Sequence, residues 1–221
     1  METDRGPVMP SIERRPLQKL SDILEGIIMV TKNGTSNGVK VAVLVGSLRA
    51  DSLNRELAEI AVANAPQGVD VSIVDGLGHV PFYSEDVDSP SGLPAPAGEL
   101  RAAVEAADAL LLVTPEYNGT LPAVLKNAID WLSRPFGEGA IKDKPVAVVG
   151  IAAGQYGGTW AHDDARRSVG VAGGRVVEKI AVSIGGAYQR FAENRPADDA
   201  EAVTQVREAV ASLAGSVALV A

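Results

Sequence analysis

Residues 46–54 concentrate four side chains that could donate hydrogen bonds to an anion, directly after an apolar run of the sequence. The four are Ser47, Arg49, Ser52 and Asn54, and apolar residues at helical spacing follow them. At a strand-to-helix turn of this kind, unpaired backbone N–H groups and the positive end of the helix dipole attract an anion. Serine hydroxyls add hydrogen bonds, and the guanidinium adds a charge-assisted one. The segment therefore predicts a phosphate-binding turn.

Two simpler explanations of this turn remain open. Asp51 or Ser52 could serve only as a helix N-cap, and Arg49 could be a solvated surface charge. The turn is neither a Walker A sequence nor a G-x-G-x-x-G fingerprint, because Leu48 and Asp51 stand where small residues would be required. A monophosphate is therefore favoured over a nucleoside triphosphate. Asp51 would repel a phosphate, so we expect it to face solvent or a backbone amide.

A second polar turn, residues 114–122, follows another apolar run. Tyr117 offers a flat face to an aromatic ring. The backbone amides of Asn118 and Gly119 could hydrogen-bond such a ring as it accumulates negative charge. The alternative is a proline-rich Asn-Gly turn with no function.

The third unusual segment, residues 152–159, is rich in glycine. Gly154 and Gly157 would let the backbone approach a flat ligand, with Gln155 and Tyr156 between them. These glycines could equally supply only a tight turn.

The elements that must position these segments alternate between strand and helix patterns. Buried-strand patterns occupy residues 39–45, 69–73, 109–113, 145–150 and 176–184. Apolar stripes at helical spacing occupy residues 53–61, 100–107, 121–132, 158–169 and 203–213. This alternation predicts an α/β fold with a five-stranded parallel sheet and helices on both faces. Because ligands bind beyond the carboxyl ends of such strands, the three unusual segments are expected to converge there.

Composition excludes several classes of function. The chain has 221 residues and no cysteine, which removes disulfides, thiolate metal sites and cysteine nucleophiles. A net charge of -8 argues against nucleic-acid partners and anionic membranes. No apolar run is long enough to span a bilayer, so we expect a cytoplasmic protein without membrane insertion. His79 and His162 are far apart and lack metal-ligand spacing, so no metal is expected.

Residues 1–38 differ in composition from the remainder and are predicted to form an N-terminal extension. Leu17, Leu20, Leu24 and Ile27 recur at helical spacing, and residues 33–38 resemble a flexible linker. The amphipathic helix could dock on a partner subunit, or the extension could be frayed. Residues 39–221 are predicted to form one domain.

Residues 46–49 with Ser52 and Asn54, and residues 114–119 running into residues 125–131, resemble motifs of the NADPH-dependent FMN reductase family. The resemblance covers about residues 39–190. It implies a flavodoxin-like three-layer sandwich that binds FMN without covalent attachment. It also implies a homodimer or homotetramer that uses NAD(P)H, with NADPH the expected donor, to reduce a small-molecule acceptor: a flavin, quinone, azo dye or metal oxyanion such as chromate.

The resemblance assigns the site residues by group. It implies that Ser47, Arg49, Ser52 and Asn54 hold the FMN phosphate. The flavin ring would be lined by Pro115, Glu116, Tyr117, Asn118 and Gly119, and by Gly154, Gln155, Tyr156 and Gly157. Hydride transfer is the chemistry of the cofactor, so no catalytic acid or base is expected.

Two rival functions share the predicted fold. A flavodoxin-type electron carrier would bind FMN but have no nicotinamide site. A phospho-accepting receiver domain would need acidic residues at the end of the first strand, and residues 43–46 contain none. The fold alone does not choose between such functions.

Overall fold

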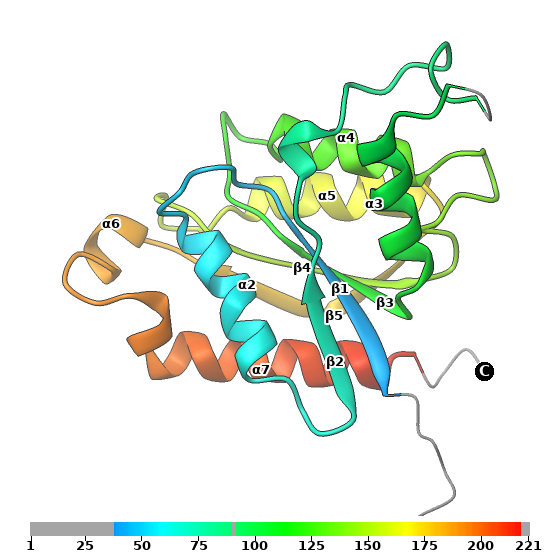
Figure 1. Cartoon of the computed structure of the whole chain (residues 1–221). Coiled ribbons are helices and arrows are strands. Elements are labelled where there is room, and N and C mark those ends of the chain that lie inside the picture. Colours follow the sequence, from blue (N-terminus) through cyan, green and yellow to red (C-terminus); the bar gives the residue numbers. More distant parts are fainter. Residues whose placement is uncertain (1–37, 90–91, 218–221) are drawn as a thin grey trace, which may run out of the picture. The chain divides into compact units, whose positions relative to one another are not determined.

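The computed structural model describes residues 38–89 and 92–217. Its centre is one parallel sheet in the strand order β2-β1-β3-β4-β5 (Figure 1). The strands are β1 (Val39–Val45), β2 (Val69–Ile73), β3 (Ala109–Val113), β4 (Pro145–Ile151) and β5 (Arg175–Ile184). The predicted five-stranded parallel sheet is therefore confirmed, and three strand bounds coincide with the sequence patterns.

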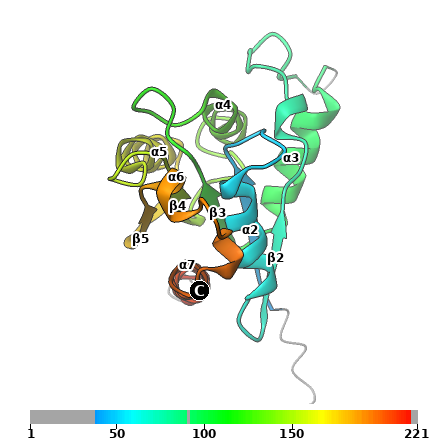
Figure 2. The same cartoon turned by 90° about the vertical axis from the view of Figure 1, so that its left-hand side faces the viewer.

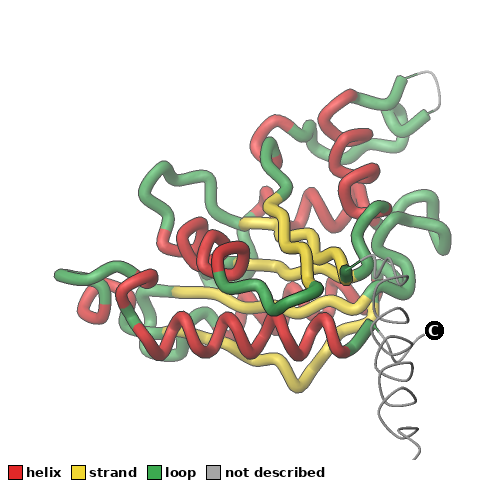
Figure 3. Tube along the Cα trace, turned by 60° about the horizontal axis from the view of Figure 1, so that its bottom comes forward, coloured by secondary structure: helices red, strands yellow, loops and turns green. Residues whose placement is uncertain are grey.

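Helices cover both faces of this sheet (Figures 2 and 3). One face is covered by α3 (Ala95–Glu105), α4 (Ala123–Leu132) and α5 (Thr159–Val171), and the other by α2 (Leu53–Ala63) and α7 (Ala200–Gly215). Each face has its own buried apolar cluster. Because side chains alternate along a strand, Val43 of β1 packs in one cluster and Leu44 in the other. The predicted flavodoxin-like three-layer sandwich is confirmed.

Burial explains why the strand sequences differ. The central strands β1, β3 and β4 are almost continuously buried, so their residues are apolar without alternation. The edge strands β2 and β5 are buried only at intervals and contain polar residues.

The edge strand β5 contains an irregularity that its sequence pattern did not indicate. Val146 pairs with Val176, whereas Val148 pairs with Ala181, so β5 has three more residues than β4 between these pairs. One guanidinium nitrogen of Arg166 lies 3.4 Å from the carbonyl oxygens of both Val148 and Ile180. Arg166 therefore compensates backbone groups at the point where the two strands separate.

Three short elements were not predicted: η1 (Leu77–His79), α6 (Ala187–Arg190) and η2 (Pro196–Asp198). Each spans only three or four residues, which is too short to produce a periodic pattern. Residues 1–37, with the expected amphipathic helix, lie outside the described residues. Within residues 38–89 and 92–217, no helix is both long and apolar enough to cross a bilayer.

Candidate functional site

The loops after β1, β3 and β4 meet at the carboxyl edge of the sheet (Figure 2). The register sets their proximity, because Val45 pairs with Val113 and Val113 pairs with Val149. The N–H of Gly46 donates to the Val113 carbonyl at 2.8 Å. Sequence reasoning predicted this convergence, and the structure brings the three segments together.

The first loop presents backbone donors at the start of α2. Ser52 is the buried N-cap, and its hydroxyl oxygen accepts from the N–H of Arg55 at 3.2 Å. The N–H groups of residues 47–51 have no hydrogen-bond partner within the described part of the chain. Arg49 and Asp51 are exposed, and the Arg49 guanidinium lies 3.4 Å from the Asp51 carbonyl oxygen. These free donors and the exposed guanidinium suit an anion.

Asn54 has a different role from its neighbours in this loop. Its side chain is buried, donates to the carbonyl of Ile151 at 2.9 Å and accepts from the N–H of Ile151 at 2.9 Å. This pair of hydrogen bonds joins the first turn of α2 to the last residue of β4. A direct phosphate contact by this side chain is therefore not favoured; Asn54 fixes the position of the turn.

A groove of about 440 Å³ lies between the first and second loops. It is lined by Gly46, Leu48, Arg49, Tyr117, Pro122, Ala123 and Val124. The only charged side chain in this lining is a guanidinium, and the other lining residues are mainly apolar. At Gly46 a Cβ atom would lie 2.9 Å from the buried Thr114 hydroxyl oxygen, so glycine lets the first loop pack closely against the base of the second. The combination suits a flat ring with an anionic group attached.

The second loop contains a tight two-residue turn. Asn118 and Gly119 both have positive φ, 52° and 77°, as in a type I′ turn. Tyr117 and Thr120 exchange backbone hydrogen bonds of 3.0 and 3.1 Å across it. The N–H groups of Asn118 and Gly119 have no acceptor among the described residues, and the Tyr117 side chain is 45% exposed. The predicted Asn-Gly turn is present, with its donors and its ring available.

Two contacts attach this turn to α5. The Glu116 carboxylate accepts from the N–H of Ala161 at 3.3 Å, and the Thr120 hydroxyl donates to Asp164 at 2.7 Å. Pro115 is buried at the base of the loop. Glu116 therefore holds the loop and the start of α5 together, which a sequence motif alone did not indicate.

The third loop depends on glycine where it meets β5. Gly157 has φ 64°, and a Cβ atom there would lie 2.4 Å from the Ser183 carbonyl carbon. Gly154 accepts from the N–H of Gly186 at 3.1 Å, which ties the loop to the segment after β5. Gln155 and Tyr156 are exposed at the loop's tip. Gly157 thus serves a close approach of two backbone segments, whereas a Cβ atom at Gly154 would meet no neighbour and the tip of the loop is exposed.

His162 lies buried beneath the second and third loops. Its Nδ1 atom is 2.8 Å from the Ser183 hydroxyl oxygen. Burial, reinforced by the positive charge of Arg166, lowers the pKa of His162 to about 4, so the ring is neutral at physiological pH. Among the residues that the structure describes, no three His, Asp or Glu side chains converge as metal ligands would.

Sequence reasoning missed Trp160 in the first turn of α5. The side chain is 65% exposed, and its Cε3 atom lies 3.5 Å from where a Cβ of Gly119 would be. The available signal was its position off the buried stripe of Ala161, Ala165 and Val169, where a large aromatic residue has no core to fill.

Comparisons with known proteins agree with this geometry. A family model described as NADPH-dependent FMN reductase matches residues 39–189. A quinone reductase of Pseudomonas putida is 38% identical over 159 residues, which is 72% of this chain and 84% of the relative. A 2-hydroxy-1,4-benzoquinone reductase of Burkholderia sp. is 45% identical over 119 residues, covering 54% of this chain and 63% of the relative.

A solved structure with the same fold is FerB, a flavoenzyme NAD(P)H:(acceptor) oxidoreductase from Paracoccus denitrificans. It superposes with a TM-score of 0.71 at 29% identity, over 82% of this chain and 98% of FerB. The matched region contains all three loops of the site. The chain belongs to the NADPH-dependent FMN reductase family of oxidoreductases.

Proposed function

We propose that the protein is an FMN-containing oxidoreductase that transfers hydride from NAD(P)H, by way of the flavin, to a quinone or similar small-molecule acceptor. The observation that supports this most directly is the groove, which connects a turn with free N–H groups and an exposed guanidinium to an exposed aromatic turn. Two relatives are quinone reductases, and they indicate the class of acceptor.

The phosphate end of FMN would be held by the first loop. The donors are the free N–H groups of residues 47–51, the Ser47 hydroxyl and the Arg49 guanidinium. Ser52 accepts one hydrogen bond from the backbone and keeps its own hydroxyl proton for donation to the phosphate. Asn54 contributes by fixing the turn to β4.

The ring of FMN would be lined by the second and third loops. Tyr117 offers its face, and the N–H groups of Asn118 and Gly119 would stabilise negative charge on the reduced ring. On the third loop, the lining residues are Gly154, Gln155, Tyr156 and Gly157.

When bound, FMN supplies the two-electron chemistry, so the side chains bind and orient without acting as catalytic acids or bases. A quinone acceptor takes up one hydride equivalent and one proton from solvent and leaves as the hydroquinone. Donor and acceptor would use the same open face of the ring in turn. We therefore expect ping-pong kinetics, with NADPH preferred over NADH as the family description suggests.

We infer further that the protein works in the cytoplasm as a homodimer or homotetramer. The lack of cysteine is compatible with a reducing compartment. Phe82 and Val171 are large, exposed apolar side chains outside the proposed cofactor groove, as expected where copies associate. Sedimentation of the purified protein would measure the assembly, and a monomer at all concentrations would contradict it.

The proposed function is tested by mixing experiments with purified protein. We expect added FMN to lose fluorescence on binding, and the absorbance of bound oxidised FMN to bleach when NADPH is added without oxygen. Added 1,4-benzoquinone should then restore the oxidised spectrum. Failure to bind FMN would refute the proposal. Binding without bleaching would favour the flavodoxin-type electron carrier instead.

A further inference from the structure

The exposed indole of Trp160 is not explained by folding. The chain has two tryptophans, and the other, Trp131, is fully buried and donates its indole N–H to the Pro81 carbonyl at 2.8 Å. Trp160 contributes no comparable burial, because 65% of its surface is accessible. Large aromatic side chains that remain exposed beside a binding groove commonly contact a ligand or a partner.

The position of Trp160 is fixed relative to the second loop. Gly119 leaves room for the indole edge, whose Cε3 atom lies 3.5 Å from the site of a Cβ there. The Glu116 contact with Ala161 and the Thr120 contact with Asp164 lie one and four residues beyond the tryptophan in α5. The indole is therefore held at the edge of the turn whose N–H groups are proposed to face the flavin ring, with most of its surface uncovered.

A second exposed aromatic side chain lies four residues before this indole. Tyr156, on the tip of the third loop, is 71% exposed, and the Thr159 hydroxyl donates to its carbonyl at 2.6 Å. The two rings thus belong to one short segment that follows β4. Tyr117, on the second loop, is a third exposed aromatic side chain, two residues before the Gly119 that the indole approaches.

The charges near the indole are negative or already paired. The carboxylates of Glu116 and Asp164 hold the adjacent turn, and Asp163, in the next turn of α5, is paired with Arg166. Arg167 is paired with Asp164, and residues 153–165 contain no lysine or arginine. An anionic acceptor would find no unpaired counter-charge among these residues, whereas an uncharged aromatic ring would find a flat apolar surface.

We propose that Trp160 is a specificity-determining residue whose indole stacks against planar, uncharged acceptors while they are held over the flavin. This inference rests on the proposed function and adds that the site prefers some of the possible acceptors to others. Quinones fit the indole surface. Oxyanions such as chromate gain no stacking and meet the carboxylates instead.

The test compares Trp160→Ala and Trp160→Phe with the wild-type protein, each loaded with FMN. Binding of hydroquinone to the oxidised protein is measured by titration calorimetry, because this product binds without turnover. We expect Trp160→Ala to weaken hydroquinone binding and to raise the KM for 1,4-benzoquinone, each by about tenfold, as for loss of one aromatic contact. Trp160→Phe should stay within about threefold, because it keeps a flat ring.

Two internal comparisons separate stacking from structural damage. Ferricyanide accepts electrons without stacking, so its reduction rate should be unchanged in Trp160→Ala. Phe136→Ala removes another exposed aromatic side chain, from the turn after α4, and should leave hydroquinone binding at the wild-type value.

Three outcomes would overturn the proposal. Unchanged hydroquinone binding in Trp160→Ala would show that the indole does not contact the acceptor. An equal loss with ferricyanide would indicate structural damage. Loss of FMN affinity, measured by flavin fluorescence, would assign Trp160 to the cofactor site. If instead the wild-type protein fails to bind FMN, the proposed function itself fails, which is a distinct result.

Discussion

At the scale of single residues, the side chains expected around the cofactor divide into two groups. Ser47, Arg49 and Tyr117 are available to a ligand. Asn54 and Glu116 instead use their polar atoms on the protein, one on the end of β4 and the other on the start of α5. The matched motif therefore includes residues that are open to a ligand and residues that hold the loops in place.

Arg49 provides a prediction at this scale. Arg49→Ala removes the only charged side chain of the groove lining, so we expect the dissociation constant of FMN to rise by about tenfold to a hundredfold. The kcat at saturating FMN should be unchanged, because the guanidinium is assigned to the phosphate and not to the ring. Flavin fluorescence titration and steady-state kinetics measure the two quantities.

Arg55→Ala is the matched control, since it removes the same charge from α2 at a site paired with Glu59 and Asp75. Its FMN dissociation constant should remain within about threefold of wild type. An Arg49 variant that keeps its FMN affinity but loses kcat would reverse the assignment.

Spacing in the sequence was sufficient to find the loops but not the partners of their side chains. The pattern at residues 46–54 predicted a turn at a helix start, and the N-cap role of Ser52 was among its explanations. The partner of Asn54, Ile151, is 97 residues away in the sequence, so the residues around Asn54 could not predict this contact. Trp160 was missed because a residue outside a helix's buried stripe is ordinarily solvent-facing and without function.

At the scale of elements, strand positions were predictable because buried central strands need continuous apolar runs and a half-buried edge strand such as β2 alternates apolar with polar residues. The bounds of β1, β2 and β3 matched the sequence patterns. Helix starts were less accurate: α3 begins at Ala95 and α7 at Ala200, each before its apolar stripe becomes regular. The irregularity in β5 is compensated by Arg166, which lies on α5, so local sequence in β5 did not indicate it.

The burial of His162 between α5 and the strand ends predicts a pH-dependent stability. Its folded pKa of about 4 lies below the ordinary value of 6.5, so between these values the unfolded chain binds the proton more strongly. The contribution of this neutral ring to the free energy of unfolding is fully present above pH 6.5 and is lost as the pH falls towards 4. The loss amounts to about 3 kcal/mol.

His162→Gln should remove this component of the pH dependence, because glutamine cannot titrate and retains a polar group near Ser183. Urea unfolding at several pH values between 7 and 4.5 measures the difference from wild type. His79→Gln, at an exposed histidine, serves as the control and should retain the wild-type dependence. Parallel curves for wild type and His162→Gln would contradict the prediction.

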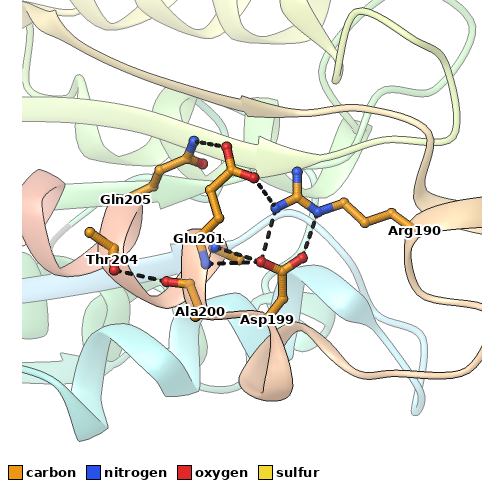
Figure 4. Close-up of polar contacts among 7 residues, drawn as sticks. Arg190, Asp199, Ala200, Glu201, Thr204 and Gln205 are labelled. Carbon is orange, nitrogen blue, oxygen red and sulfur yellow. Dashed lines mark hydrogen bonds and ion pairs between the residues drawn. The ribbon is translucent and has the colours of Figure 1, made fainter.

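At the scale of the described domain, the segment after β5 is fastened by ion pairs to α7 and α2. Arg190 on α6 makes contacts of 2.7 and 3.0 Å with the two carboxylate oxygens of Asp199, which also caps α7 (Figure 4). Glu56 on α2 accepts from Arg195 at 2.7 Å and from the N–H of Ala197 at 3.1 Å. These contacts hold the segment after β5 in place. The same segment supports the third loop, because the Gly186 N–H donates to the Gly154 carbonyl.

The pair of Arg190 and Asp199 gives a prediction for the whole domain. The guanidinium lowers the pKa of Asp199 to about 2 from 3.8, so its stabilisation is present above pH 3.8 and is lost as the pH falls towards 2. Asp199→Asn should lower the free energy of unfolding by about 2 kcal/mol at pH 6. The deficit relative to wild type should shrink as the pH approaches 2.

Glu201→Gln is the control for this pair, because Glu201 contacts the same arginine from a largely exposed position. It should change the free energy of unfolding by less than about 1 kcal/mol. Chemical unfolding followed by circular dichroism measures both variants. An Asp199→Asn deficit that persists unchanged at low pH would show that the ion pair is not its source.

The link between Asn54 and Ile151 also bears on when the chain acquires its cofactor. The two residues are separated by 97 positions, so the link cannot form before β4 has joined the sheet. Until then the turn at residues 46–54 lacks this anchor, and the loop after β4 has no fixed place. If FMN occupies the proposed groove, its uptake therefore follows the assembly of the sheet, and bound FMN would stabilise a finished domain rather than guide an unfinished one.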